Sequence, residues 1–166
     1  MTATYDLIAS VTLTTTATTV SFTSIPATYR DLVLVAKPVG FSGGNNQQAS
    51  THIRFNADTG NNYNFIDAGG DGTNTFSGVN SNLDYIDTGA TVQLNNGVGI
   101  IQIMDYSTTN KHKTVLSRGN AFNAVRMVAG RWANNAAINA IEVFTVTVAS
   151  RSYDTGSTFH LYGIVS

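Results

Sequence analysis

The sequence predicts an all-β protein, a two-sheet antiparallel β-sandwich that is jelly-roll-like and has nine or ten strands. Charged residues make up only 11% of the chain, well below the roughly 25% of typical soluble proteins. Threonine, asparagine and glycine fill the gap, and they favour strands and turns over helices. Hydrophobic content is 42%, and short apolar runs alternate with turn residues at a spacing typical of sandwiches.

Residues 1–166 are expected to form one domain, because this length matches a single core. Glycine, serine and asparagine concentrate near 40–50 and near 67–82. We interpret these two segments as long loops, and long loops in compact domains are usually functional or disordered. A shorter loop is expected at 130–136.

The segment 24–37 is the most interior-looking part of the chain. Pro26 is followed by an aromatic residue, an Arg-Asp pair and then five consecutive apolar residues at 32–36. Such a run is typical of a strand buried on both faces. Before it, the apolar residues of 5–13 recur at period two, so Leu7, Ala9, Val11 and Leu13 should share one face. A turn at 14–19 then suggests a hairpin with a second strand at 20–24.

The later strands follow from the same alternation of apolar and polar residues. In 51–56, Ile53 and Phe55 oppose His52 and Arg54, and in 97–106 alternate isoleucines define one face. The remaining strands are expected at 62–66, 114–118, 121–128, 138–149 and 157–164.

Charge and targeting signals exclude several classes of function. The net charge of −1, with 111–113 the only basic cluster, disfavours nucleic acid, which requires clustered cations. The chain has no cysteine, so no disulfide framework is expected. The start of the chain shows no signal-peptide pattern. The most apolar stretch, 136–149, is interrupted by polar residues and is too short to span a bilayer, so no membrane partner is expected.

No catalytic or metal-binding motif stands out. The three histidines lie far apart in the sequence, which disfavours a metal site. Asp58, Asp67 and Asp71 do not match a calcium loop and are read as ordinary turn residues. Serines lack a nucleophile-elbow context, and no carboxylate pair points to a glycosidase. We therefore expect no enzyme activity, no cofactor and no metal.

Four residues are candidates for an interface: Tyr5, Arg30, Asp31 and Trp132. Tyr5 ends an N-terminal arm that could add a strand to a neighbouring chain. Arg30 and Asp31 form either a partly buried ion pair or two solvated turn residues. Trp132, expected in a loop, either stacks on a sugar or packs as a core aromatic.

Four sequence blocks together resemble a family of β-sandwich structural proteins of tailed bacteriophages, frequent among cyanophages. The blocks are 5–13 (YDLIASVTL), 22–35 (FTSIPATYRDLVLV), 53–63 (IRFNADTGNNY) and 157–164 (STFHLYGI). The resemblance covers both ends and the first third of the chain, and 67–135 adds little beyond 103–106 (IMDY). It implies a virion component without enzymatic activity.

The resemblance leaves two virion roles open. The first is a capsid decoration or cement protein, a homotrimer made in the host cytoplasm that binds the major capsid protein on the outer surface of the shell. The second is a tail-fibre or other appendage knob whose loops 40–50, 67–82 and 130–136 bind a host glycan. The first strand is expected to begin near Tyr5, leaving no stalk, which favours decoration. A free carbohydrate-binding module is a third class, and it would be expected to carry a signal peptide.

Overall fold

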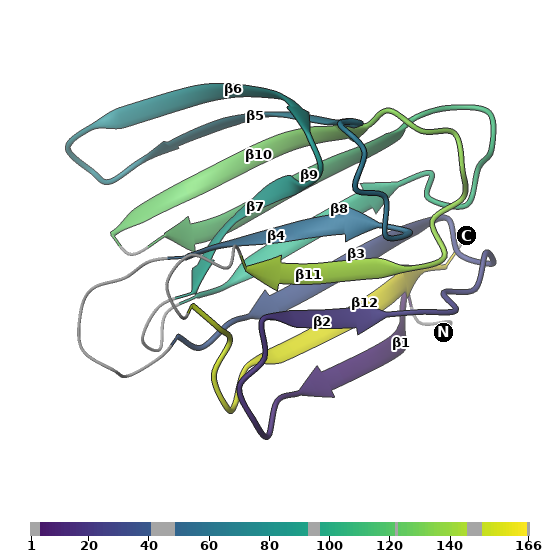
Figure 1. Ribbon diagram of the computed structural model, residues 1–166, viewed down its shortest axis with the longest axis horizontal. Helices are drawn as coiled ribbons and strands as arrows, with labels where there is room; N and C mark the ends of the chain where they lie inside the picture. The colour runs from purple at the N-terminus through teal and green to yellow at the C-terminus, as the bar shows by residue number, and fades with distance from the viewer. Residues whose placement is uncertain (1–3, 41–48, 93–96, 122, 146–150, 166) are drawn as a thin grey trace.

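Two antiparallel β-sheets pack face to face in the computed structural model, which describes residues 4–40, 49–92, 97–121, 123–145 and 151–165 (Figure 1). The larger sheet has the order β1 (Tyr5–Thr12), β12 (Thr158–Ile164), β3 (Asp31–Lys37), β8 (Gly99–Met104), β9 (Lys113–Ala121), β10 (Ala124–Trp132), β5 (Tyr63–Gly70) and β6 (Thr75–Leu83). The smaller sheet has the order β2 (Thr19–Phe22), β11 (Ile141–Thr145), β4 (Ala49–Phe55) and β7 (Ile86–Val92). The predicted all-β sandwich is confirmed, with twelve strands among the described residues rather than nine or ten. No helix in these ranges could cross a membrane.

The predicted loop at 67–82 is wrong, because this segment forms a hairpin of β5 and β6. Its turn is closed by Asp71, whose Oδ1 accepts hydrogen bonds from the backbone N–H groups of Thr73 (2.9 Å) and Asn74 (2.7 Å). This hairpin extends beyond the smaller sheet (Figure 1). Most residues of β6 are therefore exposed and show no clear apolar alternation. Of the other predicted loop, residues 41–48 lie outside the described residues, and 49–50 begin β4.

The predicted hairpin between 5–13 and 20–24 is also wrong. β1 pairs with β12 and β2 pairs with β11, so the segment between β1 and β2 crosses from one sheet to the other. The shared face predicted for β1 fails at Leu7, because the register with β12 shifts between Leu7 and Ala9. Such a bulge reverses the facing of the residues before it. Leu7 consequently points outward and is 56% exposed.

The core lies between the two sheets. Leu32, Leu34 and Ala36 of β3 are fully buried against it, whereas Val33 and Val35 point to the opposite face of the sheet. The prediction for β8 is confirmed, since Ile101 and Ile103 face the core and the residues between them face outward. The strands predicted at 114–118 and 121–128 are longer or shifted in the structure, since β9 runs to Ala121 and β10 runs from Ala124 to Trp132.

The segment leading into β3 is held by Tyr106. The Tyr106 hydroxyl donates a hydrogen bond to the carbonyl of Pro26 and accepts one from the backbone N–H of Tyr29 (3.3 Å). The ring of Tyr29 lies on Gly163, where an added Cβ would meet the ring at 2.2 Å. Asp31 Oδ1 accepts a hydrogen bond from the N–H of Asp105 (2.9 Å). Three segments far apart in the sequence are thus joined at one end of the larger sheet.

We expect Tyr106→Phe to lower the free energy of unfolding by about 1–3 kcal/mol, because it leaves the Pro26 carbonyl and the Tyr29 N–H without their partner. Tyr162→Phe is the matched control, since the hydroxyl of Tyr162 makes no hydrogen bond with a described residue. Its effect should stay within about 0.5 kcal/mol. Urea unfolding of both variants measures the difference, and equal stabilities would contradict the role given to Tyr106.

Candidate functional site

The larger sheet has one face against the core and a second face, here called the outer face, that no other described strand covers (Figure 1). Its outward side chains form two rows that cross all eight strands. The first row is Leu7, Tyr162, Val33, Gln102, Leu116, Ala129, Ile66 and Val79. The second row is Ser10, His160, Val35, Ile100, Arg118, Met127, Ala68 and Ser77. Both rows contain many apolar residues, which is unusual for an uncovered sheet face.

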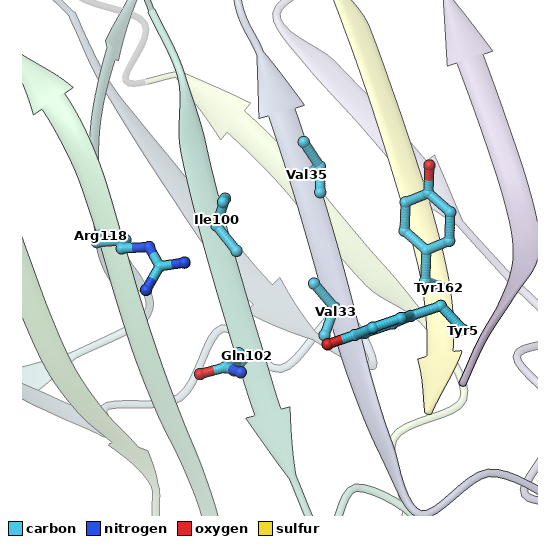
Figure 2. Close-up of a pocket in the computed structure, with 7 residues that line it drawn as sticks. All are labelled: Tyr5, Val33, Val35, Ile100, Gln102, Arg118 and Tyr162. Carbon is cyan, nitrogen blue, oxygen red and sulfur yellow. The ribbon is translucent and has the colours of Figure 1, made fainter. Parts of the chain in front are cut away.

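A groove lies in the half of the outer face formed by β1, β12, β3, β8 and β9 (Figure 2). Val33, Val35 and Ile100 form its floor. Figure 2 shows Tyr5 and Tyr162 on one side, and Gln102 and Arg118 on the other. The ring of Tyr5 extends toward Val33 and Gln102, and the guanidinium of Arg118 points toward the floor from the opposite side. We call these seven residues the outer-face groove.

Arg118 is the cation that lines the groove. Its guanidinium forms no ion pair or hydrogen bond with a described residue. Several other cations do have carboxylate partners within 4 Å, namely Arg30, Arg54, Lys111 and Arg126. The groove therefore offers an available positive charge beside an aliphatic floor.

A second feature of the outer face is an apolar patch over β5, β6, β9 and β10. It consists of Ile66, Val79, Leu116, Val125 and Met127, whose exposed fractions range from 48% to 84%. These five side chains present on the order of 500 Å² of apolar surface, near the upper end for the largest patch of a monomer. The largest apolar patch of a monomer is often functional.

A buried cluster of charged and titratable side chains lies elsewhere, around Arg126. Arg126 Nη2 lies 2.9 Å from Asp67 Oδ2, and its Nη1 lies 3.3 Å from Asp87 Oδ2. The ring of His52 is 3% exposed and stacks on Tyr85 at a centroid distance of 3.9 Å. Burial lowers the pKa of His52 to about 4, against the opposing charge of Asp87. Because ion pairs and ring packing occupy these groups, we assign the cluster a structural role.

The structure separates the four candidate interface residues. Tyr5 is half exposed and lines the outer-face groove. Arg30 and Asp31 form an ion pair of 2.9 Å between Nε and Oδ2, in which Arg30 is largely exposed and Asp31 largely buried. Asp31 also accepts a hydrogen bond from the N–H of Asp105, next to Tyr106, so it stabilises the end of the larger sheet.

The expected loop position of Trp132 is wrong. Trp132 ends β10, is 1% exposed and stacks with Tyr63 at a centroid distance of 6.2 Å. Its indole N–H donates to Asp58 Oδ2 (2.8 Å). Of the two interpretations of this residue, the structure supports the core aromatic, and no sugar can reach its ring face.

The acidic residues considered for calcium serve local structure. Asp58 accepts hydrogen bonds from Gly60 and Trp132, Asp71 closes the β5–β6 turn, and Asp67 pairs with Arg126. Within the described ranges, no three acidic or histidine side chains gather as a metal site would require.

Comparison of the chain with protein-family models, with curated proteins and with solved structures gave no match. Sequence reasoning placed Val33, Val35, Ile100 and Arg118 in strands but did not bring them together, because they come from three strands separated by up to 85 positions.

The buried, neutral state of His52 predicts a stability that falls in mild acid. The unfolded chain binds a proton at His52 near pH 6.5, whereas the folded chain does so only near pH 4. Stability should thus be unaffected by this residue above pH 6.5 and decline by up to about 3 kcal/mol as the pH falls to 4. Urea unfolding across this range measures the slope.

His52→Gln should flatten this pH dependence, and His112→Gln, at an exposed turn residue, should leave it unchanged. A His52 ring that titrates near pH 6.5 by NMR, or the same slope in both variants, would contradict the interpretation.

Proposed function

We propose that the chain is a bacteriophage virion structural protein without enzymatic activity or cofactor, a capsid decoration or cement protein. In this role it binds the major capsid protein on the outer surface of the shell and stabilises junctions between capsomers. The observation that supports the proposal most is the uncovered outer face, eight strands wide and rich in apolar side chains. A protein that works by contact alone needs a broad surface that is rigid before binding. The jelly-roll likeness expected from the sequence is part of the same proposal.

The low charge of the chain is compatible with this role. Contacts made by apolar and neutral polar groups lose less strength with salt than exposed ion pairs do. Without a disulfide, the folded chain would also gain stability by mass action when it binds the shell or its own copies. Both properties suit a protein that meets changing conditions outside the cell.

The number of copies per particle tests the proposed role against the appendage alternative. A decoration protein should be present in hundreds of copies, because it occupies equivalent sites over the whole shell, and quantitative mass spectrometry of purified virions measures this. About a dozen copies would overturn decoration and favour the knob. Virions stripped of the protein should also break at lower temperature than intact virions; unchanged heat stability would overturn the cementing role.

The apolar patch supports self-association, which a homotrimer requires. Its roughly 500 Å² is a substantial part of the about 800 Å² that each partner buries in a standard interface. None of its five side chains is charged, so covering them with a second copy carries no cost for burying an unpaired ion. In a closed trimer the patch of one copy would meet another surface of its neighbour.

We expect the purified chain to have three times its monomer mass of 17.6 kDa by light scattering. Met127→Glu, in the middle of the patch, should shift the protein to monomer, because a carboxylate would be buried without a partner. Ser21→Glu, on the exposed face of β2, is the matched control and should remain trimeric. A monomeric wild type, or a trimer unaffected by Met127→Glu, would contradict this arrangement.

A further inference from the structure

The outer-face groove has two chemically different ends. Tyr162 and Arg118 lie on β12 and β9, with β3 and β8 between them. Three interstrand spacings separate them, a span of about 14 Å. An extended chain of about four residues covers that length, since each residue advances about 3.3 Å. The groove is therefore long enough to distinguish the two ends of a short peptide.

The Arg118 end favours a carboxylate. A planar guanidinium forms paired hydrogen bonds with carboxylates, and that of Arg118 has no partner among the described residues. The surrounding face has the same sign of charge. Among the described residues of the eight strands, Lys37, Arg118 and Arg131 point outward together with one carboxylate, Asp31, which is paired with Arg30. A ligand with a negative charge is thus complementary to this surface.

The floor and the tyrosine end favour an apolar group. Val33, Val35 and Ile100 offer only aliphatic surface, and the rings of Tyr5 and Tyr162 stand beside them (Figure 2). Sugar hydroxyls placed on this floor would lose water without gaining hydrogen bonds, which is costly. A leucine-like or aromatic side chain has no hydrogen bonds to water to lose on this floor. The amide of Gln102, which bonds to no described residue, can pair with a peptide backbone.

We propose that the outer-face groove binds an extended peptide segment of a partner protein, with an apolar side chain at Tyr5 and Tyr162 and a carboxylate at Arg118. The aliphatic floor supplies affinity, and the guanidinium sets the direction of the peptide. Binding of such a segment does not require that the chain be a virion protein. The peptide-binding test below can therefore fail while the decoration proposal holds. It can also succeed if the decoration proposal is wrong.

The test uses two peptides that differ in one charge, acetyl-Leu-Ala-Ala-Asp-amide and acetyl-Leu-Ala-Ala-Asn-amide. Each is titrated into the isotopically labelled full-length chain, and amide chemical shifts are followed by NMR. The Asp peptide should shift resonances of β3, β8 and β12 around the groove. It should bind at least about 10-fold more tightly than the Asn peptide, since a charge-assisted pair contributes more than a neutral hydrogen bond.

Arg118→Gln should abolish the preference for the Asp peptide while leaving weak binding of both. Arg131→Gln, which removes an exposed cation from the same face outside the groove, should preserve the preference. Equal affinity for the two peptides in the wild type, or a preference that survives Arg118→Gln, would overturn the proposal. So would shifts centred away from the groove, or a methyl glucuronide that binds the groove more tightly than the Asp peptide.

Discussion

The Tyr106 hydroxyl is the contact on which the larger sheet depends. It holds the Pro26 carbonyl and the Tyr29 N–H together, and so fixes how the chain enters β3. Tyr29 in turn lies on Gly163 of β12, where a side chain would leave no room. β3 pairs with β12 on one side and β8 on the other, so this one corner positions the floor of the outer-face groove. Residues 22–35, 103–106 and 157–164 meet at this corner.

Much of the fold could be predicted, because strands with one face on the core alternate clearly. β8 and β12 follow this rule. The strands that were missed break it in opposite ways. In β6 most residues are exposed, and in β7 every residue is buried, so neither shows an apolar period of two. Trp132 was predicted in a loop because asparagines follow it in the sequence. Its ring nevertheless packs in the core.

The candidate site was less predictable than the fold. The groove joins residues from five strands, and only Tyr5 had been singled out. One signal was present in the sequence: Val33, Val35 and Ile100 occupy positions that alternate with the core residues, where polar side chains are expected on a solvated face. Two adjacent strands with apolar residues on both faces indicate that something covers the second face. The strand order needed to identify the neighbours, however, depends on contacts between distant segments.

The two halves of the outer face meet at Arg118. In register, Arg118 lies between Ile100 of the groove and Met127 of the apolar patch. A second copy seated on the patch would border Arg118 and remove part of its water. Charge pairs strengthen as the local dielectric constant falls, so a carboxylate in the groove would be held more firmly in the assembled protein than in the monomer. By linkage, peptide binding would then favour assembly to the same extent. Self-association and partner binding on this sheet would thereby be coupled through one side chain.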